Sequence, residues 1–334
     1  MIIKKNAIVL LAIAVITGCT TGKVGCHWEP LQWASPGAPP AIWHDKDFLA
    51  AQQAGSTCDW SRVVGFAETL IERYPNEGVA HFLLGNAYLE QLQYENALPP
   101  LRRATGLDPG SVQPWFELGL AATSVSNSEE SVTAFRKAAE LNPSQPVIWK
   151  RLAEGLRIQN KNGEAIEAYR HALDITPNDA ELWFELGRVM NQMGWTDGVI
   201  QALQRSLSIN PDGKHPTTRI LLGHALIQQG KNHEAESVFR QGIRIEPQNA
   251  ELWVYLGATL FNQGKREEAI KACRRSTDLN HAGAAVWYLL AAVYQDNGME
   301  EETNEALKQL KRLDPEAAKQ FEAMQQEASP AQAP

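Results

Sequence analysis

The sequence predicts an all-α solenoid built from one repeated unit of two helices. The chain has 334 residues, of which 44% are hydrophobic and 21% are charged, a composition typical of globular proteins. Leucine recurs every 34 residues, with one step of 36, and a glycine or alanine follows each of these leucines. Apolar residues within each period have the spacing of one face of an α-helix. Because a unit of this length cannot bury its own apolar face, stacked neighbours must supply the core.

The repeated positions agree over seven registers. Five of the seven carry tryptophan three residues before the leucine, and most end near a proline such as Pro109 or Pro143. The leucines are Leu84, Leu118, Leu152, Leu186, Leu222, Leu256 and Leu290. This pattern resembles the tetratricopeptide repeat (TPR), whose signature is W-x2-L-G-x2-Y, then A-x3-F, then P, over 34 residues. The resemblance implies a right-handed superhelix in which the small residue lets the two helices of a repeat approach closely.

The repeats divide the chain into segments. Residues 44–77 are expected to form a degenerate repeat, because Pro75 lies 34 residues before Pro109. Residues 316–327 carry apolar residues at helical spacing and are expected to form a capping helix, followed by a tail at 328–334. The seven clear repeats span 78–317, as 78–111, 112–145, 146–179, 180–215, 216–249, 250–283 and 284–317.

Two repeats depart from the pattern at the tryptophan position. His81 and Arg219 stand where the other repeats have tryptophan, so we expect these junctions to be packed less well. Cys273 falls at a core position of its repeat and is expected to be a buried free thiol.

The first eighteen residues resemble a bacterial lipoprotein signal peptide. Lys4 and Lys5 precede an apolar run, which ends in Ile16-Thr17-Gly18-Cys19. This ending resembles the lipobox, in which the cysteine is diacylated and becomes the new N-terminus. The resemblance implies lipidation of Cys19 and, with Thr20 as the second residue, a lipid anchor in the outer membrane on the periplasmic side, with surface exposure left open. The alternative is an ordinary signal peptide in which Cys19 is incidental.

Residues 19–43 form a segment rich in tryptophan and proline that has no helical period. It is either a tether or an ordered arm on the first repeats, and its three tryptophans (Trp28, Trp33 and Trp43) favour the arm. An envelope location permits disulfides, and Cys26 and Cys58 are the natural pair.

The sequence predicts no enzyme, cofactor or metal site. Its formal net charge of −8 makes nucleic acid a poor partner. The glycines before Lys231 and Lys265 have the wrong spacing for a phosphate loop, and the eight histidines form no metal-binding motif. We therefore expect protein partners and no small-molecule substrate.

The family's groove positions, carried onto this chain, define a candidate partner-binding surface on the first helices. Aromatic residues and arginine, which concentrate binding energy in interfaces, are prominent among them. The alternative is that Phe82, Phe116 and Phe184 pack between repeats and that the charged members are solvated. The candidates are Phe82, Asn86, Leu89, Phe116, Leu120, Lys150, Glu154, Arg157, Phe184, Arg188, Asn191 and Tyr288.

A lipobox followed by TPR units resembles a group of envelope lipoproteins that includes type IV pilus pilotins and peptidoglycan-hydrolase adaptors. The resemblance implies a lipid-anchored scaffold that binds and positions an envelope protein through its concave face, in the assembly of an envelope machine. Two alternatives remain open: a constitutive subunit of a larger outer-membrane or periplasmic complex, and a regulator of an envelope enzyme.

Overall fold

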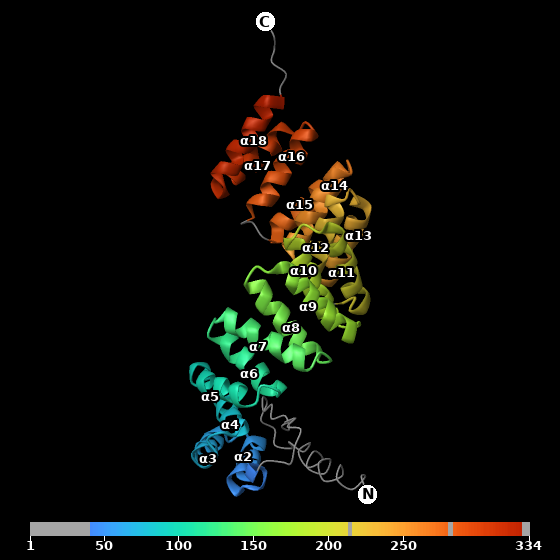
Figure 1. The fold of residues 1–334 in the computed structure, drawn as a ribbon. Helices are drawn as coiled ribbons and strands as arrows, with labels where there is room; N and C mark the ends of the chain where they lie inside the picture. The colour runs from blue at the N-terminus through green and yellow to red at the C-terminus, as the bar shows by residue number, and fades with distance from the viewer. Residues whose placement is uncertain (1–40, 213–215, 280–282, 329–334) are drawn as a thin grey trace. The chain divides into compact units, whose positions relative to one another are not determined.

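The computed structural model describes residues 41–212, 216–279 and 283–328. Within these ranges the chain forms seventeen α-helices and one short 3-10 helix, with no β-strand (Figure 1). The all-α solenoid class is therefore confirmed. The predicted signal peptide, the lipidation site Cys19, and most of the tryptophan-rich arm, with Cys26, lie outside the described residues and remain predictions.

The helices form two compact units, the first ending at Pro177 and the second beginning at Asn178. The described part of the first unit contains η1 (Ala41–His44), α2 (Lys46–Ser56), α3 (Trp60–Arg73), α4 (Gly78–Glu90), α5 (Tyr94–Leu107), α6 (Val112–Ser124), α7 (Ser128–Leu141), α8 (Pro146–Ile158) and α9 (Asn162–Ile175). The described part of the second contains α10 (Ala180–Gln192), α11 (Thr196–Ile209), α12 (Pro216–Gln228), α13 (Asn232–Ile245), α14 (Ala250–Asn262), α15 (Arg266–Leu279), α16 (Ala284–Asp296), α17 (Glu300–Leu313) and α18 (Pro315–Ala328).

The helices of each pair are joined by a turn with one recurring backbone conformation. One residue of each turn has a positive φ, between +57° at Cys58 and +74° at Gly264. The residue after the one with positive φ donates its backbone N–H to the carbonyl five residues earlier, as Gln93 N–H does to Tyr88 O at 2.8 Å. This hydrogen bond closes the end of the first helix. The pair α2–α3 has the same bond, from Asp59 N–H to Ala54 O at 2.9 Å, so the first pair has the turn of the later repeats. The eight residues are Cys58, Leu92, Ser126, Asn160, Gly194, Gly230, Gly264 and Gly298.

In five of the described pairs, a glycine of the first helix lies directly against a side chain of the second, which is leucine or phenylalanine in four of them and Cys273 in the fifth. A Cβ atom on Gly119 would lie 2.6 Å from the Phe135 ring, and one on Gly187 would lie 2.7 Å from Leu203. Real Cβ atoms do not approach other atoms so closely, so the helix axes come closer than any side chain would permit. The expectation that the small residue allows this approach is confirmed.

The tryptophans close the junction between consecutive repeats by a hydrogen bond. The indole N–H groups of Trp115, Trp149 and Trp253 donate to the proline carbonyl six residues earlier, at 3.0, 2.8 and 3.0 Å. His81 makes the same bond through Nε2 to Pro75 O at 3.0 Å, and Arg219 donates to Pro211 O. The expectation of poorer junctions at His81 and Arg219 overlooked this bond, which both substitutions retain.

Arg219 retains the bond at a cost. Its side chain is buried, and its Nε–H has no hydrogen-bond acceptor among the described residues. Burial lowers the pKa of the Arg219 guanidinium, because the charged form is deprived of water. This junction therefore combines the recurring bond with an unsatisfied buried donor.

Both cysteines among the described residues have defined states. Cys273 is a free, buried thiol, as expected, and burial raises its pKa to about 12. Cys58 is disulfide-bonded, and its partner lies outside the described residues. The Cys26–Cys58 pairing therefore stays a prediction.

The last helix, α18, covers the apolar end of the second unit. Ala318 and Phe321 are buried in one cluster with Leu307 and Leu310 of α17 and Leu290 of α16. A solenoid end left open would expose this apolar surface to water, and α18 removes that exposure.

Adding one methyl group to Gly119 tests the close approach of paired helices. Gly119→Ala should lower the free energy of unfolding by about 1–3 kcal/mol, because the new Cβ overlaps the Phe135 ring. The matched control is Gly65→Ala, which lies in the interior of α3 with open space around it and should raise the free energy of unfolding by about 0.5–1 kcal/mol. Urea unfolding followed by circular dichroism measures both. Equal stability of the two variants would contradict the account.

Replacing His81 by a ring without a donor tests the junction bond. His81→Phe should lose about 1 kcal/mol of unfolding free energy although phenylalanine is more apolar, because the Pro75 carbonyl loses its donor. His233→Phe, at an exposed histidine, controls for the change in composition. The role of the bond is refuted by a His81→Phe protein that unfolds at the same or higher urea concentration than the wild type.

Candidate protein-binding surfaces

The predicted groove residues lie on the first helices of the repeats, three each on α4, α8 and α10, two on α6 and one on α16. In α8 the trio is Lys150, Glu154 and Arg157, spaced by four and three residues, so the side chains lie one above another along one stripe. The buried residues of the same helix, Leu152, Ala153 and Leu156 among them, occupy other positions. The stripe is therefore the part of the first helix that the core leaves uncovered.

In α4 and α6 of the first unit, the stripe is partly used for packing. Phe82 is buried in the core beside Leu98 and Leu101. Phe116 is half-buried, with its ring edge-on to that of Phe135 at 5.7 Å between centroids. Both phenylalanines therefore take part in packing, and the contacts named here are with the second helix of their own repeat, whereas the alternative expected packing between repeats. Half-buried members of these stripes are Asn86, Leu89 and Leu120.

Two cationic side chains on α8 have no partner among the described residues. Lys150 and Arg157 are half-buried, and neither makes an ion pair or hydrogen bond to any described residue. Glu154 between them is held by Arg151 at 2.9 Å and so does not neutralise them. Seven residues of helix separate the two cations by roughly 10 Å along the axis. The stripe on α8 therefore carries unpaired positive charge.

In the second unit the stripe residues differ in exposure. Phe184 is buried, so it too takes part in packing. Arg188 donates to Glu185 at 2.7 Å and lies over the Phe184 ring at 6.0 Å, while Asn191 is exposed. Tyr288 packs edge-on against Phe321 of α18, at 5.2 Å between ring centroids. Arg188 and Asn191 are thus the accessible members of this set.

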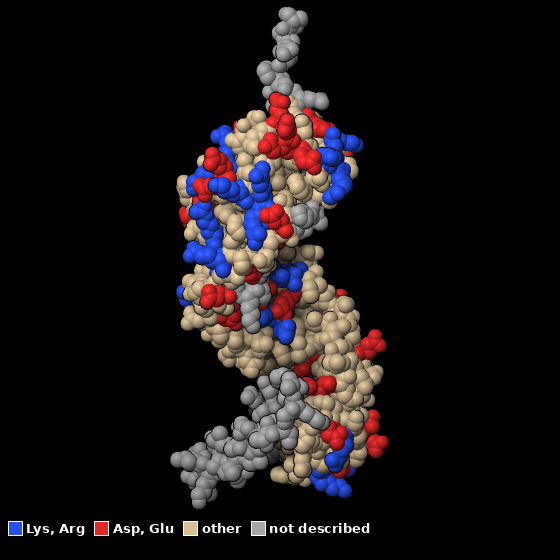
Figure 2. Space-filling view, turned by 180° about the vertical axis from the view of Figure 1, so that it is seen from behind, with Lys and Arg blue, Asp and Glu red and all other residues tan. Residues whose placement is uncertain are grey.

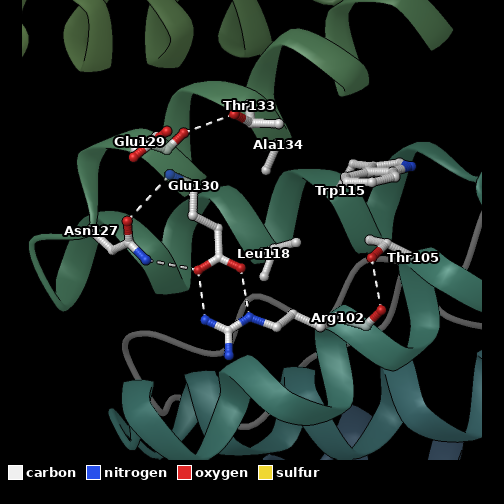
Figure 3. Close-up of a pocket in the computed structure, with 9 residues that line it drawn as sticks. All are labelled: Arg102, Thr105, Trp115, Leu118, Asn127, Glu129, Glu130, Thr133 and Ala134. Carbon is white, nitrogen blue, oxygen red and sulfur yellow. Dashed lines mark hydrogen bonds and ion pairs between the residues drawn. The ribbon is translucent and has the colours of Figure 1, made fainter.

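The structure also contains a cavity that the sequence did not reveal, where two consecutive second helices meet the first helix between them. It has a volume of about 410 Å³ and lies between α5, α6 and α7. Figure 3 shows its lining, with Arg102 reaching across to Glu130 and the Trp115 ring above Thr105. Arg102 binds Glu130 through two hydrogen bonds of 2.6 and 2.7 Å, and this bond holds the pKa of the Glu130 carboxyl below its ordinary value. Glu129 also lines this cavity, so its charged residues carry a slight excess of negative charge.

A second cavity occupies the matching place in the second unit. It lies between α13, α14 and α15, has a volume of about 630 Å³, and has the Trp253 ring in its wall. Arg240 and Glu268 form the counterpart of the first cavity's ion pair, at 2.8 Å. Three further cations, Arg244, Lys271 and Arg275, also line it. The Arg-to-Glu spacing of 28 residues recurs at Arg136–Glu164, so period analysis of charges could have located these cavities.

The described ranges contain neither a membrane-spanning helix nor a cluster of metal ligands. No described helix is long and apolar enough to cross a membrane. No group of three or more His, Cys, Asp or Glu residues in the described part of the chain is placed to hold a metal ion.

Comparison with family models identifies the repeat. The model of the tetratricopeptide repeat matches residues 66–112, 82–146 and 116–180. A model of the TPR domain of cytochrome c-type biogenesis protein H matches residues 166–272. Among curated proteins, none matches the chain by sequence.

Solved structures share the fold at low sequence identity. The C-terminal part of a TPR protein from Cytophaga hutchinsonii aligns with a TM-score of 0.61 and 15% identity, over 72% of this chain and 98% of that one. YrrB is described as a TPR protein with an unusual peptide-binding site. It aligns with a TM-score of 0.50 and 20% sequence identity, over 56% of this chain and 95% of that one. Pseudomonas aeruginosa pilF aligns with a TM-score of 0.50 and 20% sequence identity, over 66% of this chain and 99% of that one.

Proposed function

Since the chain is a tetratricopeptide repeat protein, we propose that it is a lipid-anchored scaffold that binds and positions a protein of the bacterial cell envelope through the first-helix stripes of its repeats. Proteins of this family generally serve as interaction scaffolds. The proposal requires binding and placement of a partner and no chemical step.

The unpaired cations of α8 carry the proposal. A half-buried charge without a counter-ion is costly, and Lys150 and Arg157 have none among the described residues. A carboxylate of a bound segment would supply it, and two donors roughly 10 Å apart would set the register of an extended chain. YrrB, with the same fold, is described as having a peptide-binding site, which supports a protein segment as the ligand.

The lipid anchor rests on the sequence Ile16-Thr17-Gly18-Cys19. Acyl chains on Cys19 would hold the repeats at one leaflet of the outer membrane. A partner attached to the same membrane would then be met at high effective concentration, so modest affinity would be sufficient. Pilus assembly is one envelope process consistent with the likeness to pilF.

Charge reversal on the α8 stripe tests the surface. The double variant Lys150→Glu with Arg157→Glu should recover at least one envelope protein about tenfold less well in a crosslinking pull-down from native membranes, since it repels a carboxylate. The control, Lys137→Glu with Arg170→Glu, makes the same charge change at exposed positions of the second helices. Circular dichroism should show both variants folded. Identical recovery of every protein by wild type and stripe variant would contradict the proposal.

Replacing the lipobox cysteine tests the anchor independently. Cys19→Ser should abolish incorporation of labelled palmitate and move the protein from the membrane to the soluble fraction, because the acceptor thiol is gone. Cys26→Ser is the matched control and should remain labelled. A wild-type protein that incorporates no palmitate, or a Cys19→Ser protein that stays labelled, would contradict lipidation of Cys19 without bearing on the binding surface.

A further inference from the structure

The cavity between α13, α14 and α15 combines an apolar interior with a cationic rim. Leu256, Leu260 and Ala272 are buried at its base, and Ile243 and Trp253 are half-buried in its wall. The indole N–H of Trp253 is already bonded to Pro247 O, so the ring contributes apolar surface to the cavity. Its volume of about 630 Å³ lies within the range of small-ligand sites and accommodates a large apolar side chain.

The rim carries three cations that the protein does not use internally. Arg240 is paired with Glu236 at 2.9 Å and Glu268 at 2.8 Å. Arg244, Lys271 and Arg275 are exposed and make no ion pair or hydrogen bond with any described residue. Figure 2 shows Lys and Arg side chains gathered over α13 and α15. The cavity mouth is therefore a local positive surface on a chain whose net charge is −8.

The matching cavity of the first unit shows that the fold does not require these charges. There, Gly106 stands in the repeat position of Arg244, and Thr133 stands in that of Lys271. Lys137, in the position of Arg275, is paired with Glu140 at 3.0 Å. The first cavity has the same paired Arg and Glu and the same tryptophan, so the extra cations serve no packing purpose. They are therefore available to contact a ligand.

We propose that this cavity, defined by α13, α14 and α15, binds an acidic protein segment that inserts one aromatic or large aliphatic side chain. Carboxylates of the segment pair with Arg244, Lys271 and Arg275, and the apolar side chain contacts Trp253 and Leu256. This surface is separate from the first-helix stripes, so the inference goes beyond the proposed function and is tested without reference to it.

A protein segment fits better than other anions. Nucleic acids require an extended basic face, whereas here the cations surround one cavity and acidic residues such as Glu251, Glu267 and Asp278 lie on the same three helices. A planar anionic membrane would be repelled by the same acidic residues. An acidic segment needs only a few carboxylates and one apolar side chain, which matches the composition of the cavity.

The test uses the full-length protein and a fluorescein-labelled synthetic peptide in which glutamates flank a central phenylalanine. Fluorescence anisotropy should detect binding that weakens as salt is added. Binding should fall about tenfold or more when glutamine replaces glutamate, and likewise when serine replaces phenylalanine. The triple variant Arg244→Glu, Lys271→Glu, Arg275→Glu should lose about tenfold or more in affinity, because each screened pair contributes a modest amount.

The matched control reverses the same number of charges elsewhere in the second unit. Lys308→Glu, Arg312→Glu and Lys319→Glu lie at exposed positions of α17 and α18, and this protein should bind the peptide within about twofold of wild type. Equal binding by the wild type and the cavity variant would overturn the proposal. It would also be overturned if the wild type bound vesicles containing phosphatidylglycerol and not the peptide, or if the control variant lost as much affinity as the cavity variant.

Discussion

The close contact between a glycine of the first helix and a side chain of the second, in five of the described pairs, is the constraint on which the rest of the structure depends. Gly119 facing Phe135 and Gly187 facing Leu203 bring two helices within a distance that a Cβ would prevent. This approach defines the helix pair as one rigid unit. The left-handed turn between the helices and the hydrogen bond to the proline carbonyl then determine how the pair closes and how the next pair begins. Stacking buries the remaining apolar faces.

The repeat could be predicted from sequence because its determinants are local and periodic. Leucine, glycine and proline positions sufficed to predict helix pairs, and the structure places helices at those positions. The role of the tryptophans was harder to predict from sequence, because one side chain provides both a large apolar ring and a hydrogen-bond donor. His81 and Arg219 separate these two roles, because they lack the indole ring and keep the hydrogen bond to the proline carbonyl. The sequence left open whether Phe82 and Phe184 bind a partner or pack in the core, since a stripe position can face either solvent or other helices, and the structure shows both buried.

Constant packing leaves the surface free to vary, and function in such a fold depends on that variation. The cavities beside Trp115 and Trp253 share a framework and an ion pair, yet only the second carries unpaired cations on its rim. Likewise, Lys150 and Arg157 are charged positions of a stripe that carries phenylalanine and leucine in α4 and α6. The sequence predicted the stripe from the repeat positions, but which of its charges lack partners among the described residues, and the existence of the second cavity, depend on three-dimensional placement.

The most direct measurement of the central claim is site-specific photo-crosslinking in native membranes. Benzoylphenylalanine would be placed singly at Asn86, Leu120 and Asn191 of the first-helix stripes, and at Thr133, Lys137 and Gln241 of the second helices. Mass spectrometry would identify the crosslinked proteins. The account predicts that stripe positions crosslink a shared envelope protein that second-helix positions do not capture. Crosslinks to that protein from second-helix positions alone would contradict the claim that the stripes are the scaffold's partner-binding surface.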